Sequence, residues 1–244
     1  MSGHDFTAIR VTAAGVRDAG FGTSGVARAV LGSGISAGTG VGARLSDGKL
    51  IALGSRNNYD LVYTRYTTAG AVDSGPTTAL PTGGPLDVWT WRGCAVLSDD
   101  TAIIGGEYTN INTAAQSGRL VKIDANGAAV AGWSQGANPY VDFEPSGASV
   151  EEAMAVAVDA AGRAVVAGSS NVGGNSQVFV LRFTPAGALD TSFGTGGIAL
   201  VPRLGASGDI PHALRIGADG RIVVVASKIQ DGVTEDTYFV RLNP

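Results

Sequence analysis

Polar and aromatic residues that could bind or act on a ligand gather at three places in the chain. They are Trp89, Trp91, Arg92, Glu151, Glu152, Asp209 and His212. Trp89 and Trp91 alternate, so in an extended segment they share one side and could stack on a sugar ring or a peptide. The alternative is that one or both tryptophans close a channel or pack between neighbouring sheets.

Glu151 and Glu152 are adjacent, and adjacent residues of a strand point to opposite faces. At most one of them can therefore lie opposite Arg92 and His212. Glycoside hydrolysis by paired carboxylates needs two acids that flank one bond, and only Asp209 stands where it could supply the second acid. We therefore expect binding residues here and no catalytic residues.

Metal and cofactor sites find little support. His4 and His212 are the only histidines, so a zinc site or a Ser-His-Asp triad would depend on His212 alone. The glycine cluster at 32–42 precedes a strand and lacks the Lys-Ser/Thr ending of a phosphate loop. Cys94 lies in an apolar run and is predicted to be a small buried hydrophobic residue. We predict no metal and no cofactor.

The composition narrows the classes of partner. The net charge of -4 offers no basic face for phosphates, which excludes nucleic acid as the expected partner. No apolar stretch approaches the roughly 18 residues that span a bilayer, and the first residues lack the pattern of a signal peptide. Only 16% of the residues are charged and 37 are glycine, which is typical of many short strands joined by tight turns.

A repeat of about 58 residues organises the chain. An apolar strand that ends in a basic residue recurs five times, and the repeats start near residues 6, 61, 119 and 179, with a partial copy at 238. The basic residues are Arg10, Arg65, Lys122, Arg182 and Arg241. The first four are each followed five positions later by a glycine, namely Gly15, Gly70, Gly127 and Gly187. We expect a structural role for the basic residues, such as pairing with an aspartate of the next turn.

Apolar hairpins alternate with these strands. They span 43–54, 94–106, 155–168 and 213–227, and in the first and last the turn contains Asp-Gly, which tolerates positive φ. Runs such as 163–168 are apolar at successive positions, so both faces should be buried between stacked sheets. The pattern predicts an all-β fold, a β-propeller of about four blades formed by residues 1–244 as a single domain.

A third element completes the repeat and carries a resemblance. Asp18–Val26 is matched by Asp190–Ile198, with Asp, Phe-Gly and Gly at the same offsets. Together with the Asp-Gly hairpin and the strand ending in Arg, these segments resemble the delta-60 repeat family of bacterial proteins. The best match runs from Val156 to Ile198. The resemblance implies a propeller-like fold in an exported bacterial protein, located outside the cell or on its surface, and implies no shared catalytic residues.

The strand count leaves the closure of the propeller open. The chain holds four hairpins but five strands that end in a basic residue, so four closed blades would leave one strand redundant. The other solutions are a fragment of a longer propeller, or a homodimer in which two chains pair about a two-fold axis into one ring.

The leading hypothesis is a non-catalytic repeat scaffold that presents variable loops, notably 107–118 and 131–149, to a protein or a glycan. The alternative is a carbohydrate-active enzyme or a lectin that uses the mouth of the channel around Trp91, Arg92, Glu151 and His212. A third hypothesis is a spacer or assembly module that self-associates.

Overall fold

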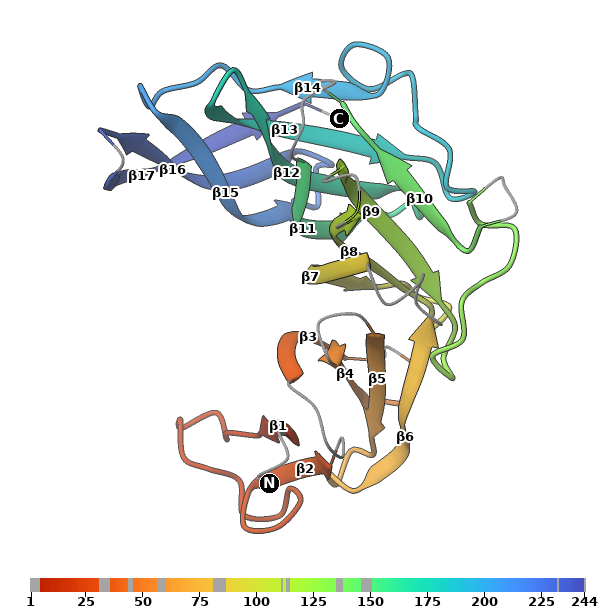
Figure 1. Cartoon of the computed structure of the whole chain (residues 1–244). Coiled ribbons are helices and arrows are strands. Elements are labelled where there is room, and N and C mark those ends of the chain that lie inside the picture. The colour runs from red at the N-terminus through yellow and green to blue at the C-terminus, as the bar shows by residue number, and fades with distance from the viewer. Residues whose placement is uncertain are drawn as a thin grey trace.

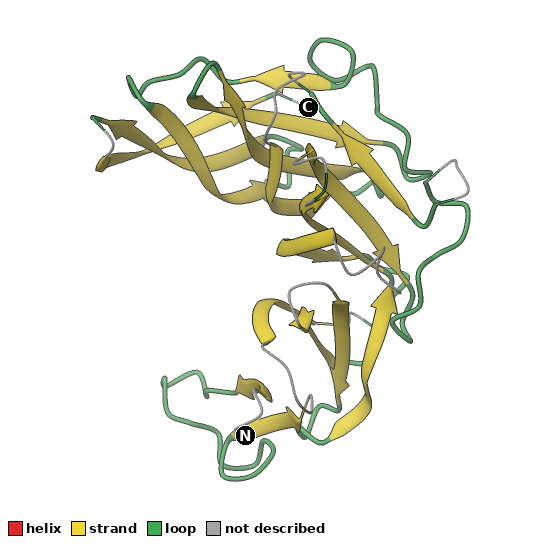
Figure 2. Cartoon of the chain, in the orientation of Figure 1, coloured by secondary structure: helices red, strands yellow, loops and turns green. Residues whose placement is uncertain are grey.

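The computed structural model describes residues 5–30, 36–43, 46–56, 60–80, 87–110, 112, 115–134, 138–145, 151–231 and 233–243. These residues form seventeen β-strands and no helix, so the predicted all-β class is confirmed for them. In that part of the chain there is accordingly no helix that could cross a membrane. The strands fall into five consecutive units joined by loops (Figure 2).

Three of the units are four-stranded antiparallel blades. Unit 2 contains β3 (Ser36–Ala43), β4 (Leu50–Arg56), β5 (Asp60–Tyr66) and β6 (Val72–Leu80). Unit 3 contains β7 (Asp87–Val96), β8 (Ala102–Asn110), β9 (Ala115–Ile123) and β10 (Tyr140–Phe143). Unit 4 contains β11 (Glu151–Val158), β12 (Ala164–Val172), β13 (Asn175–Phe183) and β14 (Ile198–Leu200).

Partial units stand at both ends of the series. Unit 1 is the pair β1 (Asp5–Ile9) and β2 (Val26–Val30). Unit 5 is β15 (Gly208–Ile216), β16 (Ile222–Gln230) and β17 (Val233–Leu242). A single pairing, Ser176 with Gly208, links the sheets of units 4 and 5.

The five units follow one another along an open arc, with unit 1 and unit 5 at its two ends (Figure 1). The first strands of the units, β3, β7, β11 and β15, neighbour one another in succession on the inner side of the arc. The strands that end in or near a basic residue are β1, β5, β9, β13 and β17. They are the third strands of units 2 to 5, and β1 holds the same position in unit 1, so we count it as the third strand of that unit. The predicted count of four closed blades is not confirmed, because the described strands form three whole blades and two partial ones, and no described strand joins unit 5 to unit 1.

Of the two segments predicted as variable loops, one is largely strand and the other contains one short strand. β8 continues to Asn110 and β9 begins at Ala115, so the expected loop at 107–118 shrinks to the few residues between them. The segment 131–149 likewise contains β10, and its residues 135–137 and 146–149 lie outside the described part. The strands β8 and β9 continue beyond their apolar residues because their backbone N–H and C=O groups still pair with each other there.

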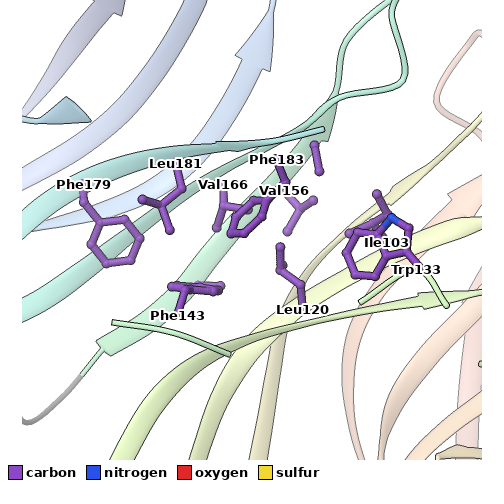
Figure 3. Close-up of a cluster of buried hydrophobic side chains, with 11 residues drawn as sticks. Ile103, Leu120, Trp133, Phe143, Val156, Val166, Phe179, Leu181 and Phe183 are labelled. Atoms are coloured by element: carbon purple, nitrogen blue, oxygen red, sulfur yellow. The ribbon is translucent and has the colours of Figure 1, made fainter. Parts of the chain in front are cut away.

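Hydrophobic clusters fill the spaces between successive units. In Figure 3, Ile103, Leu120 and Trp133 of unit 3 face Val156, Val166, Phe179, Leu181 and Phe183 of unit 4. Phe143 lies edge-on to Phe179, with ring centroids 6.0 Å apart and an interplanar angle of 79°. Val166 belongs to this cluster while Val165 is buried in the next one, between units 4 and 5. The predicted burial of both faces of 163–168 is therefore confirmed.

The recurrent basic residues join each unit to its own outer turn. Arg10 Nε donates to Asp18 and Arg182 Nε to Asp190, both at 2.8 Å, and each guanidinium lies over a phenylalanine ring of the same turn. Lys122 departs from this pattern, because its nearest carboxylate is that of Asp99, at 3.9 Å. The arginine contacts fit the predicted structural role.

A second set of bonds joins each outer turn to the preceding unit. Arg10 donates to the carbonyl oxygen of Thr68, and Arg65 donates to that of Ala125 at 2.6 Å. The indole nitrogen of Trp133 donates to the carbonyl oxygen of Pro185 at 3.1 Å. These acceptors each precede the recurrent glycine of their turn by two residues, so the joint between units is repeated three times.

Candidate functional site

Each of the four first strands carries a β-bulge at the same place. The register shifts between Gly38 and Gly40, Trp91 and Gly93, Ala153 and Ala155, and Pro211 and Ala213. The residues at the bulges are Thr39, Arg92, Met154 and His212. A bulge bends the strand and re-aims a side chain, and bulges are frequent beside binding sites. Arg92 and His212, which the sequence singled out, therefore occupy equivalent positions in units 3 and 5.

Arg92 connects two units on the inner side of the arc. Its Nε lies 3.3 Å from Oε2 of Glu152 on β11, and both side chains are partly exposed. Glu152 and its neighbour Glu151 differ sharply in burial, since Glu151 is completely buried. Of the two adjacent glutamates, only Glu152 is therefore available to a ligand at this position.

A third charged residue, Glu107 on β8, completes this site. Its carboxyl group accepts a hydrogen bond from Oγ1 of Thr109 at 3.1 Å, and it lies close enough to Glu152 for the charge of that carboxylate to act on its pKa. Burial and, next, the negative charge of Glu152 raise the pKa of Glu107, while the Thr109 hydrogen bond and Arg92 oppose the shift. We call Arg92, Glu107 and Glu152 the Arg92 cluster.

Sequence reasoning placed Glu107 in a loop and missed it as a site residue. Glu107 pairs with Thr90 of the first strand of its unit. The equivalent residues of units 4 and 5 are serines: Ser169 pairs with Glu152, and Ser227 pairs with Ile210. An alignment of the repeats by their Gly-Gly and Ala-Gly hairpin ends would have shown a glutamate where the other units carry serine. That substitution was the available signal.

Asp209 is a structural carboxylate. It is completely buried and accepts hydrogen bonds from the backbone nitrogens of Leu204 and Gly205, at 2.8 and 2.9 Å. Burial and the negative charge of Asp209 raise the pKa of Tyr238 well above its ordinary value. Because Asp209 is completely buried, it cannot flank a bond of a ligand together with Glu151 or Glu152, so the acid pairing that the sequence suggested has no support here.

His212 is exposed and is held by its own unit. Its Nε2 lies 2.6 Å from Oγ of Ser227, which is buried on the paired strand β16. His212 thus shares the inner side of the arc with Arg92, two units away. The part of the chain that the structure describes also holds no group of three or more His, Cys, Asp or Glu side chains that could bind a metal.

Trp91 lies inside the fold. Its side chain is only 5% exposed and packs with Ile51 and Leu53 in the cluster between units 2 and 3. This burial fits the alternative interpretation, in which the tryptophan packs between blades and does not stack on a ligand. Trp89 lies on β7 opposite Tyr108 in the ladder, and its side chain is outside the described part.

A cavity of about 330 Å³ lies further along the same first strands. It is lined by 94–96 of β7, 156–158 of β11, and Arg215 and Ile216 of β15. Burial raises the pKa of the Cys94 thiol in its wall, which favours the protonated thiol. Cys94 packs against the cluster between units 2 and 3 but is only partly buried, so its apolar role is supported while its predicted burial is incomplete.

Comparison with known families gives one match. The model of a family described as a domain of unknown function (DUF5122) beta-propeller matches residues 162–193. The stretch covers β12 and β13 with the turn that follows, and it supports a β-propeller type of repeat. The search of curated proteins found no match.

Solved structures share the arrangement of strands. An α-L-arabinanase from Penicillium chrysogenum, complexed with arabinobiose, has a TM-score of 0.52 at 14% identity, over 86% of this chain and 58% of that one. A mutant of the NanB sialidase from Streptococcus pneumoniae has a TM-score of 0.53 at 12% identity, over 90% of this chain and 33% of that one. The chain thus spans less than two thirds of either protein. At these identities the likeness shows the fold alone, which is propeller-like.

Proposed function

We propose that the protein is a non-catalytic, propeller-like scaffold that binds a glycan at the Arg92 cluster. The observation that carries the proposal is the ion pair of Arg92 with Glu152, 3.3 Å apart and partly exposed, on the inner side of the arc. Guanidinium and carboxyl groups are planar and can each form two parallel hydrogen bonds, which suits adjacent hydroxyl groups of a sugar. The two similar structures described above are glycan-active by name, which supports a glycan over a protein as partner.

The same geometry argues against paired-carboxylate hydrolysis as the main activity. Retaining glycosidases hold their two carboxyl groups about 5 to 5.5 Å apart and inverting ones further, so that a bond lies between them. Glu152 is instead paired with Arg92, at 3.3 Å. The completely buried Glu151 and Asp209 cannot replace Glu107 or Glu152.

A carbohydrate-active enzyme is the second candidate because of one observation. The raised pKa of Glu107 is the property that a general acid needs. Glu152 would then serve as the second carboxylate of the pair. Separation of the two groups by an incoming substrate would convert the pair into the hydrolytic arrangement.

Titration calorimetry against neutral and acidic oligosaccharides tests the proposal. Glu152→Gln and Arg92→Met should each weaken binding at least tenfold, whereas Glu144→Gln, an exposed glutamate elsewhere, should leave it unchanged. Binding without any change in the glycan supports the scaffold. Turnover that Glu107→Gln abolishes would establish the enzyme instead, and absence of binding to every oligosaccharide tested would overturn both.

The wider setting is also part of the proposal. We infer that the repeats are of the delta-60 type and that the protein acts outside a bacterial cell, where glycans are abundant. The supporting features are the Asp-x-x-Phe-Gly turns at 190–194 and 18–22, which adopt equivalent structures with Phe193 and Phe21 buried. Fractionation of a producing bacterium, with detection in the medium or at the cell surface, tests the location.

A further inference from the structure

Residues of each third strand alternate between the preceding and the following unit. In units 2 to 4 the residues that face the preceding unit are almost completely buried: Tyr66, Val121, Ile123, Leu181 and Phe183. The equivalents in unit 1 are Ile9 and Val11, which are 58% and 59% exposed, and the neighbouring Val30 of β2 is 67% exposed. Unit 1 therefore presents an uncovered blade face, which we call the head face.

The opposite end of the arc presents the complementary face. Tyr63, Leu120 and Val180 face the following unit from β5, β9 and β13, and each is completely buried. The equivalent residue of β17 is Phe239, which is 73% exposed. We call this side of unit 5 the tail face. An exposed aromatic residue and three exposed aliphatic residues thus stand at the two ends of the same series.

The two partners of the hydrogen bond that recurs at the internal joints also lie on these two faces, the donor on the tail face and the acceptor on the head face. Arg241 of the tail face is equivalent to Arg65, which donates to the carbonyl oxygen of Ala125 in the next unit. In the head face, the turn 12–16 has the hydrogen bonds of the turn 124–128 and places the carbonyl of Ala13 at the equivalent position.

Gly15, in the turn of the head face, shows that this face has open space where an internal joint is filled. A Cβ atom built on Gly127 would lie 2.6 Å from the ring of Tyr63 in the preceding unit. A Cβ atom on Gly15 would meet no atom within 4 Å, although the two glycines have similar positive φ. Aromatic side chains of the preceding unit occupy this space at the three joints among units 1 to 4, beside Gly70, Gly127 and Gly187, and the space is open at the head face.

We propose that the head face of one copy packs on the tail face of a second copy, as a repetition of the internal joint. Within one chain the two faces lie at opposite ends of the open arc (Figure 1). The contact is heterologous, and two equal contacts about a two-fold axis close a ring.

The mass in solution tests this joint. Light scattering across a range of concentrations should show a dimer that dissociates on dilution. Ile9→Lys and Phe239→Glu should each raise the dissociation constant at least tenfold, because each places a charge in an apolar contact. Leu200→Lys is the matched control, since Leu200 is 50% exposed on β14 and belongs to neither face. Circular dichroism should show the same strand content in all three variants.

Mixing the two variants gives the decisive measurement. The Ile9→Lys copy keeps a native tail face and the Phe239→Glu copy keeps a native head face, so an equimolar mixture should regain the dimer. A wild-type chain that is monomeric at every concentration, a dimer that neither variant weakens, or a mixture that stays monomeric would each overturn the proposal. If the wild type forms assemblies larger than a dimer and both variants abolish them, the copies are joined by the same contact in an open series, and the proposal stands.

Discussion

The hydroxyl group of Tyr63 donates a hydrogen bond of 2.7 Å to the carbonyl oxygen of Ala125, in the turn of the following unit. The ring of the same tyrosine covers Gly127, which stands two residues later at a φ of 83°. One aromatic side chain thus contacts both a polar and an apolar atom of the neighbouring turn. This pair of contacts explains why the glycine recurs, since the turn needs positive φ and the neighbour needs the space.

Gly127→Ala should lower the free energy of unfolding by about 2 to 4 kcal/mol. Roughly 1 kcal/mol arises from positive φ, and the clash with the Tyr63 ring adds about 1 to 3 kcal/mol. Gly15→Ala has the same backbone cost but no clash, so it should cost about 1 kcal/mol. Urea denaturation at a concentration where the chain is monomeric measures both. Equal losses would show that the tyrosine contact contributes nothing.

Trp91→Ala should destabilise the fold by about 3 to 5 kcal/mol, because it removes a buried indole from the cluster between units 2 and 3. Leu200→Ala, at an exposed apolar position, should change the stability by no more than about 0.5 kcal/mol. Thermal unfolding followed by fluorescence measures the difference. A stable Trp91→Ala protein would argue against the packing role and would return the indole to the candidates for ligand stacking.

The scaffold was predictable from the sequence because it repeats. Arg10, Arg65 and Arg182, with glycines at a fixed offset, share one geometry, and each of these arginines pairs with an aspartate eight residues later. The closure was not predictable. Whether a series of blades forms a ring depends on the angle between successive sheets, which small differences in packing set and no motif encodes.

The site was predictable only in part. Arg92 and His212 were singled out for their residue types, and the structure adds that both stand at bulges. Glu107 was missed because periodicity gives the face of a residue but not its partner in another unit. Burial separates Glu151 from Glu152, and adjacent residues of one strand give no sign of which one faces the core.

The pKa of Glu107 should respond to its two neighbours in opposite directions. Glu152→Gln removes a negative charge and should lower the pKa, while Arg92→Met removes a positive charge and should raise it. Carbon-13 NMR titration of the side-chain carboxyl groups measures both shifts. A pKa that is the same in the two variants would show that burial alone sets it.

The stability should depend on pH through the same group. Because the pKa of Glu107 is higher in the folded than in the unfolded protein, the folded state binds the proton more tightly. Its contribution is present below the ordinary glutamate pKa and is lost as the pH rises through the raised pKa. Denaturation midpoints of the wild type should fall over that interval, and those of Glu107→Gln should not.

Acid should weaken the outer turns by the opposite route. The Ser192 hydroxyl, more than the Arg182 guanidinium, holds the pKa of Asp190 below its ordinary value. The stabilising contribution of Asp190 is therefore present above the ordinary aspartate pKa and is lost as the pH falls through the depressed one. Ser192→Ala should reduce stability at neutral pH and flatten its decline in acid. An unchanged acid profile would assign the decline to other carboxylates.

The acceptors at the internal joints are main-chain oxygen atoms, and every amino acid supplies one. Thr68, Ala125 and Pro185 have side chains with nothing in common, yet each receives the bond from the unit before it. The donor side must supply a side-chain N–H group, from arginine or tryptophan, whereas any residue can stand on the acceptor side. A gene that duplicates such a unit therefore gains a compatible neighbour at once, and later mutations at the acceptor position leave the attachment intact.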